Sequence, residues 1–143
     1  RAAGLKNHAA QISFPGGRLD PEDDGPRAAA LREAKEEIGL DPSVVEVIGY
    51  LPDHLVVSGY RVTPVLGLVD PGHKLVLNPD EVVSTFEVPV DHVFDPANHC
   101  TRRRRFDNGD EVDIYDIAYG EYHIWGATAG MLLTLYRLTQ SLE

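Results

Sequence analysis

The chain has 143 residues, of which 23 are acidic and 13 basic, so its formal net charge is −10 at pH 7. Its length is close to that of one domain, and a composition with 43% hydrophobic and 25% charged residues excludes intrinsic disorder. The excess negative charge repels nucleic-acid backbones and anionic membranes, so neither is an expected partner. To bind a small anionic substrate, the protein would need local positive charge, such as a bound metal ion.

The single cysteine, Cys100, cannot form an intramolecular disulfide, which fits a reducing compartment. No stretch approaches the roughly 18 apolar residues that a membrane-spanning helix requires, and the start of the chain has no signal-peptide pattern. These features predict a cytoplasmic protein.

The first part of the chain predicts a turn followed by a helix. Residues 11–14 form a short segment of mixed character before a turn at Pro15–Gly17, where two glycines permit positive φ values. Pro26–Ile38 is rich in strong helix formers, begins with a proline tolerated in the first turn, and is followed by Gly39, a residue typical of helix ends. The sequence therefore predicts a helix over residues 26–38.

The remainder of the chain is mostly β-rich until its last helix. Strands are expected at Val44–Tyr50, Gly59–Val69 and Val82–Val90, with a sheet edge or bulge at Pro64. A hairpin is expected over residues 102–119, since Asn108-Gly109 suits a tight turn. Leucines at three- and four-residue spacings predict an amphipathic helix over residues 125–142 that packs on a sheet. The order strand, helix, several strands, helix indicates a mixed α/β or α+β sandwich.

Three glutamates of the first helix carry the strongest chemical signal. At about 100° per residue, Glu33, Glu36 and Glu37 fall within an arc of about 100° on one side of the helix. Mutual repulsion of such carboxylates is removed by a hard divalent cation, which prefers oxygen ligands. Alone, the pattern is more often a solvated acidic face. Here the glycine turn and the acidic loop over residues 20–24 precede the helix, and a glycine turn beside a helix N-terminus can hold phosphate. The combination points to pyrophosphate chemistry.

Residues 16–40 resemble the Nudix box, in which a glycine, five residues, a glutamate and seven residues precede Arg-Glu-apolar-x-Glu-Glu-x-Gly-apolar. Residues 32–40 fit this pattern, with Ala34 in the apolar position. Upstream, Asp24 stands at the spacing of the pattern's glutamate, and Gly17 is one residue early. The loop is therefore one residue longer here, and Asp23 or Asp24 takes the acidic position.

A second resemblance is to the coenzyme A pyrophosphatase branch of the same family. The matching residues at the start of the chain are Arg1, Leu5, His8, Gln11, the run 12–17 (ISFPGG) and Asp20. Residues 59–65, 80–82 and 125–129 are also similar to that branch, whereas Ala10 stands where its signature has glycine. The branch normally has a strand before the residue that matches Arg1, so one Nudix domain over residues 1–143 without its N-terminal strand is expected.

The resemblance implies an α/β/α sandwich with a mixed sheet between helices, and Mg²⁺- or Mn²⁺-dependent hydrolysis of coenzyme A to 3′,5′-ADP and 4′-phosphopantetheine. It makes Glu33 and Glu37 metal ligands, Glu36 a further ligand or water-positioning group, and Arg32 the residue that orients the glutamates. Glu81 is a candidate general base from outside the box, although a plain loop glutamate is an equal alternative. Related enzymes are often dimers, so a homodimer is compatible with the resemblance.

Other residues have both a functional and a structural interpretation. The resemblance makes His8, Gln11, Gly16 and Gly17 candidates for substrate binding, although a lone histidine near a turn is more often a surface residue. Arg102–Arg105 could meet phosphates, but on a hairpin strand they would alternate in direction, and a solvated sheet edge is favoured. Trp125 and the tyrosines before it could stack on an adenine; core packing is the favoured interpretation.

Two further functions compete with coenzyme A hydrolysis. One is a Nudix hydrolase for another nucleoside diphosphate derivative, such as ADP-ribose, NADH or a dinucleotide polyphosphate. The box residues would act only on the pyrophosphate, which all these substrates share, so the box cannot distinguish them. The other is a catalytically silent domain that binds a nucleotide as a sensor. The presence of all three glutamates counts against the silent domain, because their mutual repulsion is unfavourable and a domain without catalysis would not require it.

Overall fold

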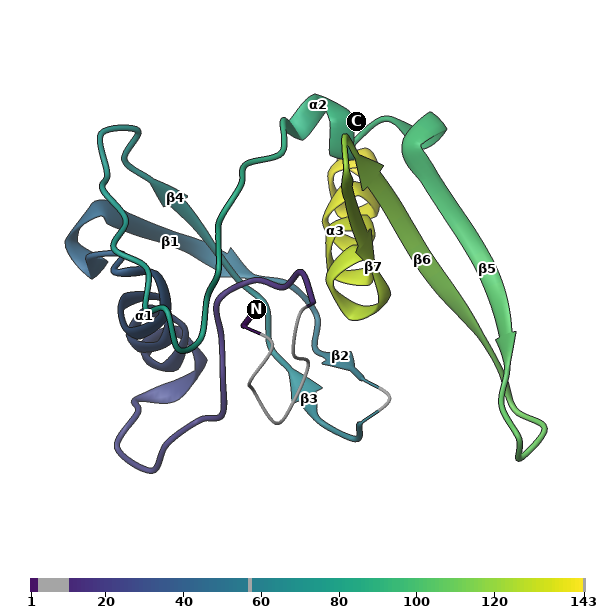
Figure 1. Cartoon of the computed structure of the whole chain (residues 1–143), viewed down its shortest axis with the longest axis horizontal. Helices are drawn as coiled ribbons and strands as arrows, with labels where there is room; N and C mark the ends of the chain where they lie inside the picture. Colours follow the sequence, from purple (N-terminus) through teal and green to yellow (C-terminus); the bar gives the residue numbers. More distant parts are fainter. Residues whose placement is uncertain (3–10, 57, 143) are drawn as a thin grey trace. The chain divides into compact units, whose positions relative to one another are not determined.

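The computed structural model describes residues 1–2, 11–56 and 58–142 (Figure 1). The chain divides into two compact units, Arg1–Thr85 and Phe86–Glu143, and each is described by itself. In both, the described strands pair in antiparallel fashion and lie beside helices, which confirms an α+β architecture. No helix within the described ranges has the length and apolar character needed to cross a membrane.

The first unit contains one long helix and two small antiparallel strand pairs within its described residues. Its elements are α1 (Gly25–Ile38), the 3-10 helix η1 (Pro42–Val44), β1 (Val45–Tyr50), β2 (His54–Leu55), β3 (Arg61–Val62) and β4 (Val65–Val69). Strand β1 pairs with β4, and β2 pairs with β3. The N–H of Ser43 at η1 donates to the side chain of Asp41, and this hydrogen bond lowers the pKa of that carboxyl.

Helix α1 begins and ends where the sequence predicted, to within one residue. Pro26 lies in its first turn, and Gly39 follows its last residue with φ 67°, a left-handed conformation that suits glycine. The N–H of Gly39 donates to the carbonyl of Lys35 at 3.0 Å and closes the helix. A Cβ built on Gly39 would lie 2.7 Å from the carbonyl oxygen of Val76, so the chain returning past the helix end leaves no room for a side chain.

We expect Gly39→Ala to lower the free energy of unfolding by about 2–4 kcal/mol, because a left-handed alanine costs about 1–2 kcal/mol and the clash with the Val76 backbone adds to it. Gly25→Ala is the matched control: Gly25 also has a positive φ, 87°, but no atom lies within 4 Å of its added Cβ. It should cost only about 1–2 kcal/mol, the cost of the left-handed conformation. Urea unfolding of the two variants measures the difference, and equal losses would contradict the packing argument.

The strand predictions of this unit are partly right. Residues 44–50 form β1 as expected, and the stretch over residues 59–69 is divided at Thr63-Pro64 into β3 and β4. Residues 11–14 have no regular structure, and the strand predicted at Val82–Val90 is wrong. Val82 is buried but Val83 is 71% exposed, and Pro89 has no N–H, so this apolar stretch finds no strand to pair with among the described residues.

The second unit is a three-stranded sheet with a helix on one face (Figure 1). Its elements are α2 (Val90–Val93), η2 (Pro96–Asn98), β5 (His99–Arg105), β6 (Glu111–Tyr119), β7 (Tyr122–Trp125) and α3 (Gly126–Gln140). The predicted hairpin is confirmed as β5 and β6, joined by a turn in which Gly109 has φ 90°. Strand β7 was not predicted, because four residues after a turn show too short a pattern.

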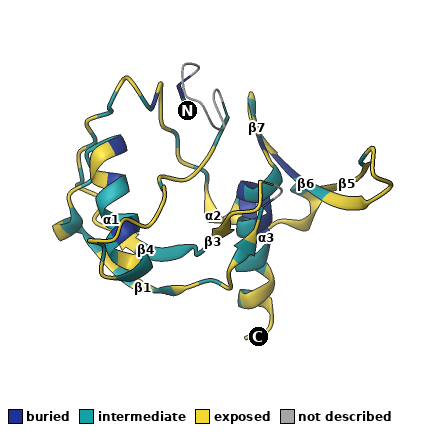
Figure 2. Cartoon of the chain, turned by 90° about the horizontal axis from the view of Figure 1, so that it is seen from below, coloured by how far each residue is buried: buried dark blue, intermediate teal, exposed yellow. Residues whose placement is uncertain are grey.

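The core of the second unit lies between the sheet and α3. Ile117 and Ile124 are partners on neighbouring strands, and both are buried, as are Ala129 and Leu133 of α3. Figure 2 shows buried stretches, in dark blue, on both the sheet and α3. The guanidinium of Arg137 on α3 lies 5.3 Å from the ring centroid of Tyr115 on the same face of the sheet. The predicted amphipathic helix and its packing on a sheet are therefore confirmed, and no helix among the described residues of this unit lies on the opposite face.

Candidate active site

The box glutamates meet the glycine turn on one side of α1. Glu37 is only 5% exposed, and its Oε1 accepts a hydrogen bond from the N–H of Gly16 at 3.1 Å. The side chain of Glu33, one helical turn earlier, is 16% exposed and lies against Gly17. Residues far apart in the sequence thus bring a turn that can contact phosphate to a pair of carboxylates.

The carboxyl of Glu37 has a raised pKa, and burial is the main cause. Loss of water raises the pKa of its carboxyl to about 7, with a further upward contribution from the neighbouring Glu33 carboxyl, against the lowering effect of the Gly16 hydrogen bond. Two negative charges on the neighbouring Glu33 and Glu37 carboxyls are therefore unfavourable near neutral pH. A cation that binds both carboxylates would remove that cost.

Close packing, rather than backbone conformation, requires the second glycine of the turn. We expected positive φ values at Gly16 and Gly17, but neither has one. A Cβ built on Gly17 would lie 2.4 Å from Oε1 of Glu33, whereas no atom of the described residues lies within 4 Å of a Cβ on Gly16. Gly17 therefore lets the turn approach Glu33 directly.

Arg32 ties the helix to the loop before it. Its Nη1 lies 3.0 Å from Oε1 of Glu33 and 3.3 Å from Oε2 of Glu36. Its Nη2 also donates to the carbonyl oxygen of Arg18 at 3.2 Å. The hydrogen bond to Asp23, with a smaller contribution from Glu33, raises the pKa of Arg32 above its ordinary value. Arg32 thus contacts two of the three box glutamates, Glu33 and Glu36.

Of Asp23 and Asp24, it is Asp23 that contacts Arg32. Nε and Nη2 of Arg32 donate to the two Asp23 oxygens at 3.0 and 2.9 Å, a bidentate arrangement. This contact lowers the pKa of the Asp23 carboxyl. Asp20 lies farther from the guanidinium, at 3.4 Å. Asp24 precedes α1 and makes no side-chain capping hydrogen bond. Spacing alone had left the choice between the two aspartates open.

The other predicted site residues are less closely connected to this cluster. Glu36 has a side chain 56% exposed, turned toward Arg32. The carbonyl oxygen of Gln11 accepts a hydrogen bond from the Arg1 amino group at 2.7 Å, and His8 lies outside the described residues. Glu81 stands in a loop anchored to the end of α1, because the N–H of Asn78 donates to the carbonyl of Glu37 at 2.9 Å. Within the described ranges, the Glu81 side chain makes no hydrogen bond or ion pair.

One contact was missed by sequence reasoning. Arg18, whose carbonyl accepts from Arg32, donates through Nη2 to the hydroxyl of Tyr60, and its guanidinium lies 5.1 Å from the Tyr60 ring centroid. Tyr60 belongs to the segment 59–65 that resembles the coenzyme A branch, and this resemblance was the sequence feature that could have indicated the contact. The pair connects the glycine loop to the β2–β3 hairpin.

The donor set fits a hard divalent cation in chemistry. Glu33 and Glu37 present carboxylate oxygens whose mutual repulsion a cation relieves. No group of three or more His, Cys, Asp or Glu side chains is preformed as a metal site among residues 1–2, 11–56 and 58–142. Glu36 would have to turn from Arg32 to become a third ligand.

Comparison with known proteins agrees with this geometry. The model of the NUDIX domain matches residues 1–108. The chain is 42% identical over 138 residues to proteins described as uncharacterized Nudix hydrolase NudL from Escherichia coli O7:K1, Escherichia coli K12 and Shigella boydii serotype 4, covering 94% of this chain and 70% of each relative. The chain therefore belongs to the Nudix family, and it is a pyrophosphohydrolase that acts on a nucleoside diphosphate derivative.

Proposed function

We propose that this Nudix enzyme hydrolyses the pyrophosphate bond of coenzyme A and releases 3′,5′-ADP and 4′-phosphopantetheine. The observation that carries the proposal is the contact between the run that resembles the coenzyme A branch and the box. Gly16 donates to Glu37, and Gly17 lies against Glu33. The residues of the resemblance thus stand beside the carboxylates that would act on the pyrophosphate.

In the proposed mechanism, Glu33 and Glu37 hold Mg²⁺ or Mn²⁺, with Glu36 as a further ligand or water-positioning group. The bound ion supplies neutralisation of the pyrophosphate oxygens and a lower pKa for a bound water. Arg32 keeps Glu33 in place through the hydrogen bond at 3.0 Å. Water adds to one phosphorus, the bridging P–O bond breaks, and a carboxylate base accepts the proton. We assign that base to Glu81.

Gln11, Gly16, Gly17 and His8 are the proposed substrate-binding residues of the loop side. The N–H of Gly16 donates a hydrogen bond to Oε1 of Glu37. We propose that the turn contacts substrate phosphate once a metal ion occupies the carboxylates. A cytoplasmic location and a homodimer complete the proposal.

A product assay tests the substrate. The chain is incubated with coenzyme A, ADP-ribose, NADH and diadenosine polyphosphates in parallel, with Mg²⁺ and Mn²⁺ in turn, and products are separated by chromatography. Release of 4′-phosphopantetheine well above turnover of the other substrates is the expected result. Faster hydrolysis of another substrate would move the enzyme to a different branch, and no hydrolysis of any would favour the silent nucleotide-binding domain.

Asp23→Asn tests the contact that orients Arg32. The amide cannot accept both guanidinium hydrogen bonds, so kcat should fall about tenfold or more, as is typical when a partner of a metal-site residue is lost. Asp24→Asn makes the same charge change one residue away, outside the contact. Steady-state rates at saturating Mg²⁺ compare the two variants. Equal losses would show that only loop charge matters.

A further inference from the structure

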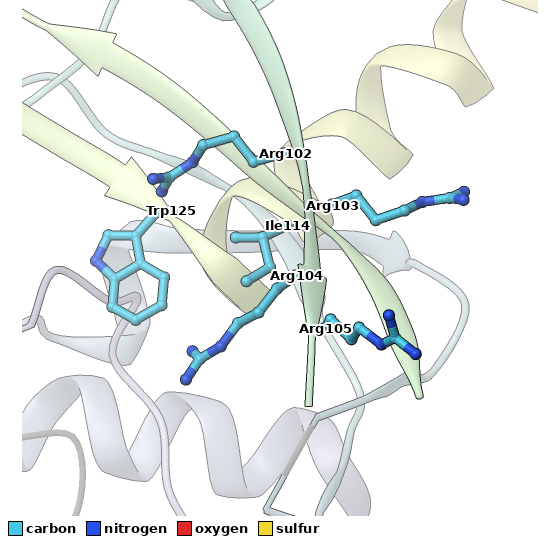
Figure 3. A pocket seen from close by; sticks show the side chains of 6 residues that line it. All are labelled: Arg102, Arg103, Arg104, Arg105, Ile114 and Trp125. Carbon is cyan, nitrogen blue, oxygen red and sulfur yellow. The ribbon is translucent and has the colours of Figure 1, made fainter. Parts of the chain in front are cut away.

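The second unit contains an open hollow on the face of its sheet opposite α3. It has a volume of about 490 Å³, within the usual range of small-molecule sites, and all of its lining residues belong to this unit. The lining residues are Arg102, Arg103, Arg104, Arg105, Ile114 and Trp125 (Figure 3). None of them belongs to the Nudix box.

Strand geometry determines which arginines can serve this hollow. Arg102 on β5 pairs with Ile114 on β6, and Trp125 on β7 pairs with Asp116 on β6. Because Ile114 and Asp116 are two residues apart on one strand, these four side chains share one face of the sheet. Alternate residues of β5 point to opposite faces. Figure 3 shows Arg102 and Arg104 extending to the side of Trp125, while Arg103 and Arg105 extend away from it. The alternation expected from the sequence is therefore present, with two arginines on each face.

The positive charge on the Trp125 side is only partly balanced. Arg102 lies 3.6 Å from the buried carboxylate of Asp116. Arg104 has no carboxylate partner among the described residues, and its guanidinium lies 5.2 Å from the Phe106 ring centroid. On the other face, Arg103 lies 3.4 Å from both Glu111 and Asp113. A planar guanidinium with free donors matches phosphate oxygens well.

Trp125 adds an aromatic surface to this charge. We favoured a core position for it, and that interpretation is wrong: Trp125 is 42% exposed at the end of β7. The tyrosines 115, 119 and 122 are half-buried and are not among the buried residues of the core. An exposed indole beside arginines can stack on a planar base while they contact a phosphate.

We propose that the hollow lined by Arg102, Arg104 and Trp125 binds a mononucleotide, with the arginines on its phosphate and the indole on its base. A single nucleotide fits better than a nucleic acid, because the net charge of −10 repels a long polyanion. The proposal does not depend on hydrolysis of coenzyme A. It replaces the interpretation of these arginines as only a solvated sheet edge.

The chain contains one tryptophan, so its intrinsic fluorescence reports on Trp125 directly. The chain is titrated with adenosine 3′,5′-bisphosphate in EDTA, which keeps metal ions from the box glutamates. We expect saturable quenching, with at least tenfold weaker binding of adenosine and of inorganic phosphate. No quenching at millimolar nucleotide would overturn the proposal, and so would tighter binding of a single-stranded oligonucleotide.

Arg104→Gln and Arg105→Gln form a matched pair, since both remove one charge from adjacent exposed positions that point in opposite directions. Arg104→Gln should weaken binding at least tenfold and Arg105→Gln less than threefold. Equal weakening would show a general charge effect and overturn the site. If the far-ultraviolet circular dichroism of Arg104→Gln shows that this variant does not fold, Arg102→Gln takes its place in the comparison. Because the readout is binding without metal, its failure is separate from failure of the product assay.

Discussion

Replacing Glu37 by glutamine is expected to lower kcat for Mg²⁺-dependent hydrolysis by about a thousandfold or more. Glutamine has the same shape and still offers an oxygen to the N–H of Gly16, 3.1 Å away in the wild type. It removes the anionic ligand from the most buried carboxylate of the helix. Loss of about 4 kcal/mol of transition-state stabilisation is reasonable for a metal ligand and corresponds to a thousandfold in rate.

The same substitution should not harm the fold, which separates a site defect from misfolding. In the absence of metal, burial raises the pKa of the Glu37 carboxyl in the folded state to about 7, above its ordinary value of 4.5. Ionising this carboxyl therefore opposes folding, an effect that is absent below pH 4.5, grows between pH 4.5 and 7, and is complete above pH 7. The metal-free variant should thus equal the wild type in stability at pH 4 and exceed it at pH 8.

Glu46→Gln on β1 is the control, because Glu46 is exposed and lies outside the site. Its turnover and its stability in EDTA should match the wild type at both pH values. Thermal unfolding at the two pH values and steady-state kinetics at saturating Mg²⁺ supply the measurements. Normal turnover by Glu37→Gln would remove Glu37 from the proposed site.

Predictions succeeded where a local signal is sufficient. Helix α1 ends at the residue before Gly39 because a left-handed residue stops a helix regardless of its surroundings. The β5–β6 hairpin forms around Gly109 for a similar reason. Arg32 reaches Glu33 and Glu36 because these positions adjoin it or lie one helical turn away. In each case the decisive atoms are within a few residues.

Predictions failed where the outcome depends on a distant partner. Val82–Val90 has the composition of a strand, yet a strand exists only if another backbone pairs with it. The choice between Asp23 and Asp24 depends on how the loop folds back on Arg32, which spacing cannot show. Trp125 is exposed because no segment of the described second unit covers that face of the sheet. These are tertiary effects, and no local pattern carries them.

The role of Gly17 illustrates the same limit within the site and leads to a second large effect. Sequence reasoning explained the glycine by backbone freedom, but the space beside Glu33 is what requires it. In Gly17→Ala, a Cβ 2.4 Å from Oε1 would push the Glu33 carboxylate or the turn away. Displacement of a reacting group by about 1 Å can cost about a hundredfold in rate. We therefore expect kcat to fall ten- to a hundredfold.

Gly49→Ala on β1 is the matched control, because Gly49 has no positive φ and no atom lies within 4 Å of its added Cβ. It should retain wild-type kcat. Mg²⁺ titration of both variants locates the defect: displacement of Glu33 should raise the Mg²⁺ concentration required for half-maximal activity in Gly17→Ala alone. A lower kcat with unchanged Mg²⁺ dependence would mean that the turn, and not the metal ligand, had moved. Because the backbone of Gly17 keeps an ordinary φ, strain cannot account for the loss, and the variant isolates the contact between the turn and Glu33.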